Sequence, residues 1–522
     1  MLNLQNIKER ILNLNEYDVN SFQNDNNSFP KFITKLRIDS FRNLNNLDIN
    51  FKHPITIISG INKIGKTSIL LLLACSHERF LKLHATKPAT QLVEHSWRDI
   101  IRFTQHENSD QNYQYQMWWR EGNAPLKNGT GKRIAGTGAW TGLAKKSSTP
   151  RTNAKIKRRE VRLIDLERIA PARSFSNSLF YKSNRTQLRR LDEDIEKAFA
   201  YIFDLTSVEL SEAGSHINKR CYLIKSNDGN AYSSYGSASG EEAVINILRD
   251  IIESEKNSLI LIDELEAAFH PLIQRKLADI IQFISWEHKK QFIITTHSPT
   301  LLSSFDKKSR RFIEKSLLGE LRAIEKISQA AAFSKMDSMA HPLIYLYCED
   351  RIAQFIVSKI INIIVANHPS FNKMINIIPS GPADQVRNDY ERHKHNYPQM
   401  HRKIGYGAVF DGDYKEKAGY SSYYNNANEY SFFLFPYMAP EKFLAKAYLQ
   451  ENPSNELESF LTHQNHHSVF RKMHELGMAA DEADARNLCF ACFEQTDDFL
   501  TFKDNFKQFL TRTITHFSEE GD

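Results

Sequence analysis

Residues 55–67 read ITIISGINKIGKT, an apolar, β-branched run followed by a loop bounded by glycines. The last eight residues, from Gly60 to Thr67, match the pattern G-x-x-x-x-G-K-[ST]. Glycines allow the backbone amides to turn inward around an anion, and a helix that starts at the end of the loop adds its dipole. The stretch therefore predicts a strand, a phosphate-binding loop and a helix, in that order.

Each part of the loop has an expected role in binding ATP. Lys66 should reach the β- and γ-phosphates, and the Thr67 hydroxyl should ligate Mg²⁺. An accidental glycine turn would give the same letters without the flanking strand and helix, so the context favours a nucleotide site. The residues predicted to bind the nucleotide are Gly60, Asn62, Gly65, Lys66, Thr67 and Ser68.

A second apolar run, SLILI at 258–262, is followed by Asp263 and Glu264. A strand of this kind carries Asp263 to the edge of a sheet, where its carboxylate can hold the water shell of Mg²⁺. Glu264 should point the other way and can orient or deprotonate an attacking water. Alone, the run could be a buried strand that merely ends in two acids, but the phosphate loop upstream favours the catalytic interpretation.

Two shorter strings complete the expected nucleotide site. Ser239-Gly240 opens a helix expected over 241–253, where backbone amides and the Ser239 hydroxyl could hold a γ-phosphate bound to another subunit. Helix capping is the commoner reason for such a string. His297 follows a strand expected at 292–295, which would bring it near the γ-phosphate, although a single histidine is more often surface or core filler.

The remaining pattern predicts an α/β protein. Strands and helices alternate along the chain, which is typical of a mostly parallel sheet covered by helices. The expected strands are 35–38, 47–51, 55–59, 161–166, 258–263 and 292–295, and the expected helices are 66–83, 192–202, 241–253 and 271–286.

Residues 107–160 lack apolar periodicity apart from a strand-like segment at 113–119, and they are rich in glycine, serine, asparagine and lysine. They predict an exposed insertion. Its end carries a basic run that could lie along nucleic-acid phosphates, although such a run is more often a solvated loop. The run comprises Lys145, Lys146, Arg151, Lys155, Lys157, Arg158 and Arg159.

A second α/β pattern begins near residue 342 and gives way to helices from about residue 440. It predicts strands at 343–348, 374–378 and 407–410 and a helix at 351–365. Because the carboxyl ends of parallel strands meet at one edge of a sheet, polar residues that follow these strands should lie close together.

Acidic residues follow two of these strands. Glu349 follows the first, Asp411 and Asp413 follow the third, and Glu441 comes later as a further candidate ligand. Carboxylates that meet at one edge repel one another unless a cation neutralises them, and Mg²⁺ or Mn²⁺ prefers such oxygen ligands. Metals of this kind activate water and stabilise the leaving oxygen in phosphodiester cleavage. An α/β domain with acidic loops and no metal is the alternative.

The nucleotide motifs together resemble those of the ABC ATPases, and more closely their SMC-like and OLD-like branch. The resemblance rests on LRIDSFRNL at 36–44, DELEAAFHP at 263–271 and THSP at 296–299. It covers about residues 32–305. Leu265 stands where the family often has proline, and the signature string lacks its leading leucine.

This resemblance implies an ABC-type P-loop ATPase head, two of which clamp two ATP molecules between them. Ser239 and Gly240 would then act on the ATP of the other subunit, and His297 would sense the γ-phosphate. Gln105 would be the Q-loop glutamine. The resemblance also implies a homodimer or another even-numbered homo-oligomer, assembled through the heads.

The acids of the C-terminal half resemble those of a Toprim domain, the nucleotidyl-transfer and hydrolysis module of OLD-family nucleases. Glu349 would match its first-strand glutamate, and Asp411 and Asp413 its Asp-x-Asp pair. Two departures affect the second metal position, because Asp350 stands where the family usually has glycine and Ala353 where it has an acid. A degenerate domain that binds without cutting therefore stays open.

The composition bounds the remaining possibilities. A chain of 522 residues exceeds one usual hydrophobic core, and 41% apolar with 25% charged residues is ordinary for globular proteins. The net charge of +6 permits a nucleic-acid partner without requiring one. No apolar run reaches the roughly 20 residues of a membrane span, no signal peptide is visible, and the five scattered cysteines suit a reducing compartment. We expect a cytoplasmic protein.

The chain is expected to hold a lead-in at 1–31, an ABC-type ATPase domain at 32–335, a Toprim-like domain at 340–450 and a helical region at 451–522. By resemblance it would be an OLD-like ATP-dependent nuclease acting on DNA or RNA in anti-phage defence, like retron-associated or Gabija-like effectors. A separate effector or a retron RNA–DNA molecule is a further candidate partner. The alternative is an ATPase sensor or scaffold, as in Septu-like or PARIS-like systems, whose degenerate Toprim domain recruits or restrains a separate nuclease or toxin.

Overall fold

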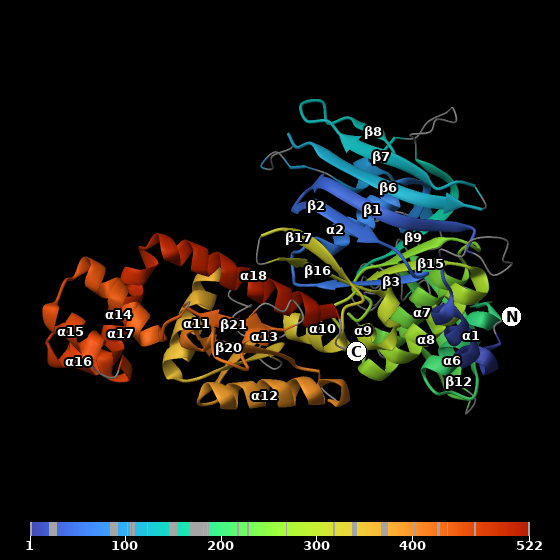
Figure 1. Cartoon of the computed structure of the whole chain (residues 1–522). Coiled ribbons are helices and arrows are strands. Elements are labelled where there is room, and N and C mark those ends of the chain that lie inside the picture. The colour runs from blue at the N-terminus through green and yellow to red at the C-terminus, as the bar shows by residue number, and fades with distance from the viewer. Residues whose placement is uncertain are drawn as a thin grey trace. The chain divides into compact units, whose positions relative to one another are not determined.

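The computed structural model describes the chain except residues 1–2, 20–28, 84–91, 102, 105, 107–109, 123, 146–154, 167–180, 182–184, 186, 217–218, 227–228, 238, 268, 317–318, 337–341, 367–373, 401–402, 425–428, 436, 464–465 and 520–522. The chain forms two compact units, one of residues 1–315 and 320–326 and the other of residues 316–319 and 327–522 (Figure 1). No described helix is both long and apolar enough to cross a membrane.

The described residues of the first unit form an eight-stranded sheet with the order β17-β16-β3-β15-β14-β9-β4-β5. The strands from β16 to β4 run parallel, and β17 and β5 are antiparallel edges. Every residue of β3 (Ile55–Gly60), β14 (Leu259–Ile262) and β15 (Gln291–Thr295) is buried, as in a sheet covered on both faces. The other strands are β4 (His77–Leu83), β5 (Leu92–Glu94), β9 (Ile156–Ile164), β16 (Arg310–Lys315) and β17 (Leu321–Glu325).

The helix after the phosphate loop is shorter than the sequence predicts. Helix α2 (Lys66–Cys75) packs against β3, β14 and β15, and all its residues except Thr67 are buried. The prediction of a helix to residue 83 is wrong, because the chain becomes β4 at His77 and pairs with β9. The other described helices of this unit are α1 (Ile7–Glu16), α3 (Trp97–Ile100), α6 (Glu193–Ile202), α7 (Ser239–Ile252), α8 (Pro271–His288) and α9 (Pro299–Ser304).

A second sheet of the first unit is antiparallel, with the order β2-β1-β6-β7-β8. It contradicts the prediction that residues 107–160 are an exposed insertion, because three of its strands come from that stretch. Alternate residues of β6 are buried, among them Tyr115 and Met117, so the stretch has one apolar face. The strands are β1 (Lys31–Phe41), β2 (Leu44–Asn50), β6 (Tyr113–Glu121), β7 (Lys127–Arg133) and β8 (Trp140–Gly142).

A third, four-stranded antiparallel sheet packs beside α6 in the same unit. Its strands are β10 (Arg189–Arg190), β11 (Val208–His216), β12 (Lys219–Ser226) and β13 (Ala231–Ser233). The chain passes from β13 into α7, so this sheet precedes the helix that carries the Ser239-Gly240 string.

The second unit is built on a four-stranded parallel sheet with the order β19-β18-β20-β21. Its strands are β18 (Ile344–Cys348), β19 (Ile375–Pro379), β20 (Gly405–Asp411) and β21 (Ser431–Leu434). Phe432 of β21 packs against Phe502, Phe506 and Phe509 of the last helix, with ring centroids 5.0–5.6 Å apart. The helices are α10 (Gln329–Met336), α11 (Arg351–Ile364), α12 (Ala383–Asn396), α13 (Ser421–Tyr424), α14 (Pro440–Glu451), α15 (Asn455–His463), α16 (Val469–Glu475), α17 (Glu482–Glu494) and α18 (Asp497–Glu519).

The architecture confirms an α/β chain with a helical C-terminal region. Each strand that the sequence predicts falls inside or across an observed strand, and the four predicted core helices are present, although the first of them ends at Cys75. The domain boundaries predicted at 335–340 and at 450 stay predictions.

Candidate nucleotide site and acid cluster

The phosphate loop connects β3 to α2, as the sequence predicts. Gly60 has a φ of 153°, and a Cβ there would lie 2.5 Å from the carbonyl oxygen of Ile313 on β16. Gly65, the N-cap of α2, has a φ of 103°. Both positions therefore favour glycine strongly. Asn62 is exposed in the loop, and Ser68 is buried in the first turn of α2.

Lys66 folds back over this loop. Its Nζ donates to the carbonyl oxygens of Gly60 at 3.0 Å and Ile61 at 3.2 Å. Burial lowers the pKa of Lys66 to about 8, and the charges of Glu264 and Asp263 act in the opposite direction. A phosphate would be a stronger, charge-assisted acceptor than these carbonyls. The ammonium is thus held where an anion in the loop would meet it.

Asp263 joins the two sides of the expected Mg²⁺ site. Its Oδ2 accepts a hydrogen bond from Thr67 Oγ1 at 2.8 Å, and its Oδ1 accepts one from Thr295 Oγ1 at 2.5 Å. The side chain is 8% exposed. The carboxylate and hydroxyl oxygens of Asp263 and Thr67 are ligands that suit Mg²⁺. The structure therefore brings together the two residues predicted to hold that ion.

Thr295 also positions Glu264, and the sequence interpretation missed it. Glu264 has a φ of 50°, an uncommon conformation for a residue other than glycine, and its N–H donates to Thr295 Oγ1 at 3.0 Å. One hydroxyl therefore donates to Asp263 and accepts from the backbone of Glu264. The sequence does offer one signal for Thr295, because this residue ends β15, the strand that pairs with β14.

Glu266 holds the loop that carries His297. Its carboxylate accepts hydrogen bonds from Thr296 Oγ1 at 2.7 Å and from the His297 N–H at 2.5 Å. Burial lowers the pKa of His297, and the nearby charge of Lys66 lowers it further. The imidazole thus lies within electrostatic reach of the lysine of the phosphate loop, and its contact with a γ-phosphate stays a prediction. The role of Glu266 was not foreseen.

Ser239 and Gly240 begin helix α7, so the predicted helix start is confirmed. The side chain of Ser239 lies outside the described residues, and so does the whole of Gln105. The contact of Ser239 and Gly240 with a second subunit's ATP and the Q-loop role of Gln105 stay predictions.

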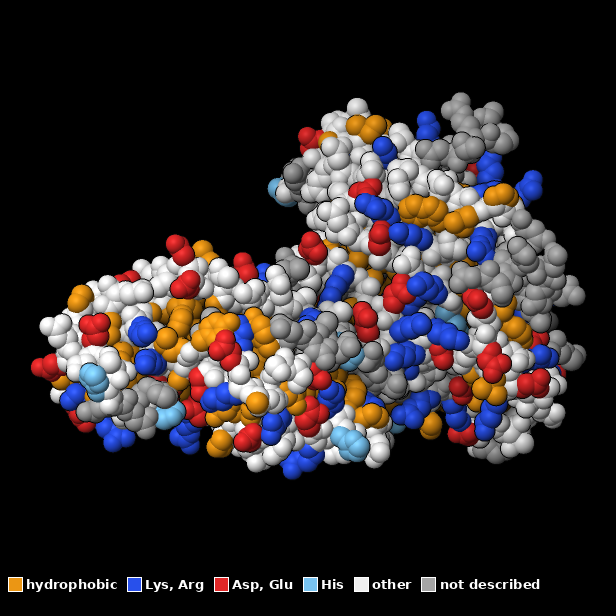
Figure 2. Space-filling model, in the orientation of Figure 1, with side chains coloured by type: hydrophobic (Ala, Val, Ile, Leu, Met, Phe, Trp, Pro, Cys, Tyr) orange, Lys and Arg blue, Asp and Glu red, His pale blue; other side chains and the backbone are white. Residues whose placement is uncertain are grey.

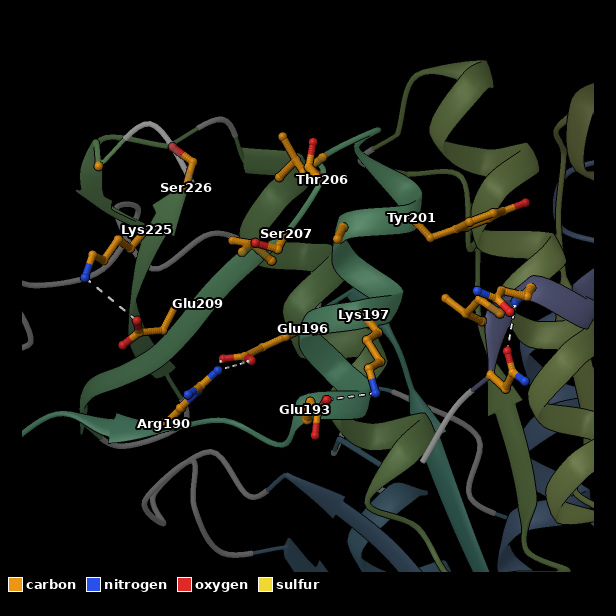
Figure 3. A pocket seen from close by; sticks show the side chains of 17 residues that line it. Arg190, Glu193, Glu196, Lys197, Tyr201, Thr206, Ser207, Glu209, Lys225 and Ser226 are labelled. Atoms are coloured by element: carbon orange, nitrogen blue, oxygen red, sulfur yellow. Dashed lines mark hydrogen bonds and ion pairs between the residues drawn. The ribbon is translucent and has the colours of Figure 1, made fainter.

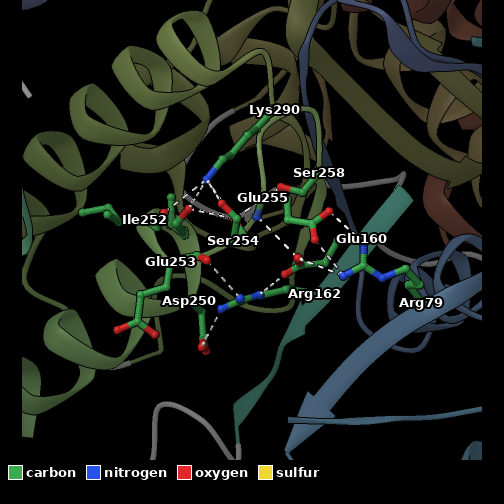
Figure 4. Close-up of polar contacts among 11 residues, drawn as sticks. Arg79, Glu160, Arg162, Asp250, Ile252, Glu253, Ser254, Glu255, Ser258 and Lys290 are labelled. Carbon is green, nitrogen blue, oxygen red and sulfur yellow. Dashed lines mark hydrogen bonds and ion pairs between the residues drawn. The ribbon is translucent and has the colours of Figure 1, made fainter. Parts of the chain in front are cut away.

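The far end of α7 is fixed by a buried lysine (Figure 4). Lys290 is 0% exposed, and its Nζ donates to the carbonyl oxygens of Ile251 at 2.6 Å and Ser254 at 2.8 Å. These are carbonyls that a helix end leaves without partners. Because Lys290 immediately precedes β15, it ties the helix that begins at Ser239 to the strand that ends at Thr295.

In the second unit, Glu349 and Asp411 lie side by side at the carboxyl edge of the sheet. Strands β18 and β20 pair in parallel, and the Asp411 N–H donates to Glu349 Oε1 at 3.0 Å. The Asp411 side chain is 9% exposed, and its buried Oδ1 has no hydrogen-bond partner among the described residues. Burial, with the charge of Glu349, raises the pKa of Asp411 well above its ordinary value. Burial raises the pKa of Glu349 to about 7.

The neighbouring acids are already engaged. Asp413 Oδ2 accepts from Lys417 Nζ at 2.9 Å, Glu441 Oε1 contacts His467 Nδ1 at 2.8 Å, and Asp350 caps helix α11. Among the described residues, no group of three or more histidine, cysteine or acidic side chains is arranged to hold a metal. The three-carboxylate metal site is therefore not assembled in this arrangement, although Asp411 offers a buried oxygen that a cation would satisfy.

Gly412 sits between the two aspartates where the backbone is most crowded. A Cβ at this position would lie 1.4 Å from the carbonyl oxygen of Phe435, and the Tyr437 N–H donates to the Gly412 carbonyl at 3.1 Å. The chain that leaves β21 therefore passes directly against the turn that carries Asp411 and Asp413.

A cleft of about 1060 Å³ lies beside α6, β11 and β12 in the first unit (Figure 3). None of the phosphate-loop residues lines it. Its charged side chains pair with one another, so it presents little net charge to a ligand. The pairs are Arg190–Glu196, Lys197–Glu193 and Lys225–Glu209.

Part of the basic run predicted to contact nucleic acid serves the fold instead. Lys155 and Arg159 are 6% and 3% exposed, and Arg159 Nη2 donates to Gln291 Oε1 at 3.2 Å. Lys146 and Arg151 lie outside the described residues. Elsewhere on the first unit, basic side chains gather on the face shown in Figure 2, with acidic side chains among them. A nucleic-acid partner stays a prediction.

The fold and the nucleotide site of the first unit define a mixed α/β, P-loop ATPase head. Residues 144–303 match the family described as "AAA domain, putative AbiEii toxin, Type IV TA system". No curated protein matches the chain at a significant level.

Several solved structures are similar to part of the chain. The SMC head domain from Thermotoga maritima is 14% identical, with a TM-score of 0.34, over 56% of this chain and 98% of that one. The Smc head domain of Pyrococcus furiosus, bound to the C-terminal domain of ScpA, is 12% identical over 56% and 96%, with a TM-score of 0.35. The recombination mediator RecF of the RecFOR pathway is 10% identical over 56% and 98%, with a TM-score of 0.31.

Proposed function

We propose that this chain is an OLD-like, ATP-driven switch whose second unit is a Toprim-like, divalent-metal-dependent nuclease acting on DNA or RNA. The pairing of Glu349 with Asp411 at one sheet edge supports this proposal most strongly. A buried carboxylate oxygen without a partner costs about 1–3 kcal/mol or more, and a bound cation would offset that cost. Among the described residues, no donor forms a hydrogen bond with Asp411 Oδ1.

The donor set fits Mg²⁺ or Mn²⁺, which favour carboxylate oxygens. Glu349 and Asp411 would hold the ion, and when bound it would supply Lewis-acid chemistry for phosphodiester cleavage. The Asp411 N–H fixes one oxygen of Glu349, which orients the carboxylate toward its neighbour. Burial of Asp411 keeps bulk water away from that oxygen and strengthens any electrostatic contact it makes.

The head would regulate this edge through ATP. Lys66 and Thr67 would bind the phosphates and Mg²⁺, and Glu264 would deprotonate or orient the attacking water. His297 would sense the γ-phosphate, and Ser239 with Gly240 would contact the ATP of a second head. Hydrolysis would then separate the heads and reset the nuclease.

The biological setting that we propose is anti-phage defence. The family name matched by residues 144–303 refers to AbiEii toxins and type IV toxin–antitoxin systems, which is consistent with a role in a conflict system. A retron RNA–DNA molecule or a separate effector protein would be a partner in such a system.

The nuclease is tested by incubating the full chain with plasmid DNA and with single-stranded RNA, in Mg²⁺ or Mn²⁺, with and without ATP. The variants are Asp411→Asn and Glu349→Gln, with Asp504→Asn on the exposed surface of α18 as the matched control. We expect cleavage to fall at least 100-fold in the two site variants while ATP hydrolysis and control cleavage stay unchanged. If wild type hydrolyses ATP yet cuts neither substrate under any condition, the nuclease proposal is wrong.

A second candidate function has its own support in the acid cluster. Asp413 is paired with Lys417, Glu441 contacts His467, and Ala353 stands where an acid would complete a second metal position. These features favour an ATPase sensor or scaffold that recruits or restrains a separate nuclease or toxin. Intact ATP hydrolysis without cleavage or Mn²⁺ binding would favour this candidate.

A further inference from the structure

We infer that the ammonium group of Lys417 is a built-in counter-ion of the acid cluster, which must leave Asp413 before the Oδ2 oxygen that it holds can ligate a divalent cation. This inference rests on the proposed metal site at Glu349 and Asp411. It adds a control step that neither the motif nor the strand order indicates.

The contact geometry places Lys417 directly on Asp413. Its Nζ lies 2.9 Å from Asp413 Oδ2, and it also lies 3.3 Å from the centre of the Tyr414 ring. Asp413 and Lys417 are four residues apart and belong to one turn, so the pair forms within a single short segment. An ammonium held by a carboxylate and an aromatic ring occupies a defined position although it is partly exposed.

The pair can open without disturbing the fold. The side chains of Lys417 and Asp413 are 47% and 39% exposed, and exposed ion pairs contribute only about 0.2–1 kcal/mol. Rotation of the lysine side chain into solvent would suffice to free Asp413. A divalent cation carries twice the charge of the ammonium, so it can compete for the same oxygen.

The state of the other acids shows why this step would limit ion binding. One oxygen of Glu349 accepts the Asp411 N–H, Glu441 contacts His467, and the buried Oδ1 of Asp411 has no partner among the described residues. Asp411 would therefore be the first ligand. The Oδ2 oxygen of Asp413 becomes available only when Lys417 moves.

The test is Mn²⁺ binding to the full chain, measured by electron paramagnetic resonance of free Mn²⁺ with saturating ATP and Mg²⁺ held at the head. The variants are Lys417→Met and Lys417→Arg, and the matched control is Lys415→Met, because Lys415 lies over the rings of Tyr424 and Tyr437 instead. We expect Lys417→Met to tighten Mn²⁺ binding about fivefold, the upper range for loss of an exposed ion pair. Lys417→Arg and Lys415→Met should bind like wild type.

A double-mutant cycle separates this inference from the proposed function. In an Asp413→Asn background, Lys417→Met should no longer tighten binding by the same factor, since the carboxylate it releases is absent. If Lys417→Met binds Mn²⁺ with the same affinity as wild type, the inference about Lys417 is wrong, while the proposed metal site still stands. If neither protein binds Mn²⁺ above the level of Asp411→Asn, the metal site itself is wrong and the inference with it.

Discussion

Thr295 contacts both acids of the nucleotide site through one hydroxyl group. It donates to Asp263 and accepts from the Glu264 N–H, so it sets the position of the residue predicted to hold Mg²⁺ and of the residue predicted to activate water. Valine has the same shape without the hydroxyl. Its introduction would leave a buried carboxylate oxygen and a backbone donor without partners, each at a cost of about 1–3 kcal/mol.

We therefore predict that Thr295→Val lowers kcat for ATP hydrolysis about 10- to 100-fold and changes ATP affinity little. Thr295→Ser, which keeps the hydroxyl, should restore most of the activity. Steady-state hydrolysis and equilibrium binding of a fluorescent ATP analogue measure the two quantities. A Val variant that hydrolyses ATP at the wild-type rate would contradict the assigned role of Thr295.

The acid pair of the second unit predicts a pH dependence of stability. Burial raises the pKa of Glu349 from 4.5 to about 7, and burial with the charge of Glu349 raises that of Asp411. The folded state therefore binds more protons than the unfolded state between these values. The stabilisation is fully present below about pH 4.5 and is lost as pH rises through about 7.

In the absence of divalent ions, we expect the midpoint of thermal unfolding to fall by several degrees more in wild type than in Asp411→Asn between pH 5.5 and 8. Each 1 kcal/mol moves the midpoint by about 2–4 °C in a domain of this size. Mn²⁺ should restore stability at pH 8 in wild type only. Parallel pH profiles for the two proteins would show that the pair does not titrate as described.

At the scale of elements, the sequence predicted the buried parallel strands well and the exposed antiparallel ones poorly. Runs such as 258–262 are apolar on both faces, and in a short segment that pattern is typical of a strand buried within a sheet. Strands β7 and β8 have the sequences KNGTGKR and WTG, which are rich in glycine and polar residues. They are held in the sheet by pairing of β8 with β7 and of β7 with β6, and β6 pairs in turn with β1, which is distant in sequence; a local pattern does not record that distant partner.

The prediction of a helix at 66–83 was wrong beyond residue 75 for a related reason. The segment HERFLKL at 77–83 has no strong preference for a strand, yet it pairs in parallel with β9. Tertiary pairing thus overrides local propensity in this segment.

Some residues of the candidate sites could be predicted from the sequence, and others could not. Glu349 and Asp411 were predictable, because acids after parallel strands must meet at one edge. Thr295, Glu266 and Lys417 were not, since a single polar residue carries no periodicity and its partner is fixed only by the fold. The burial of Lys155 and Arg159 likewise follows from tertiary packing, which cannot be read from a run of basic residues.

Lys290 links two elements, and this link gives a prediction at their scale. Lys290→Met would remove a donor from the carbonyl of Ile251, which the Ser254 hydroxyl also contacts, and from the carbonyl of Ser254, just past the end of α7. We expect a loss of about 1–3 kcal/mol in stability and faster hydrogen exchange across 239–254, with the exposed Lys256→Met as the control. Unchanged exchange in that segment would mean that Lys290 does not hold the helix end.

At the scale of the whole molecule, the proposed clamp predicts an assembly that depends on nucleotide. Glu264→Gln should bind ATP without hydrolysing it and should accumulate a stable even-numbered oligomer, because the step that separates the heads is blocked. Lys66→Ala should fail to bind ATP and should not form this assembly. Sedimentation velocity with and without ATP measures both.

Two results would count against the clamp. Tight ATP binding by Lys66→Ala would refute the phosphate-loop assignment. A Glu264→Gln protein that stays in one assembly state at every ATP concentration would show that nucleotide does not drive pairing of the heads.

The turn between Asp411 and Asp413 offers a way to judge whether distantly related proteins share an ancestor. Because the carbonyl oxygen of Phe435 fills the space beside Gly412, even a methyl group there would push apart the segments that follow β20 and β21. Either aspartate, by contrast, can change while this close contact is kept. Among distant kin, a retained glycine would therefore record common ancestry of the scaffold, and retained acids on both sides of it would record selection for the chemistry.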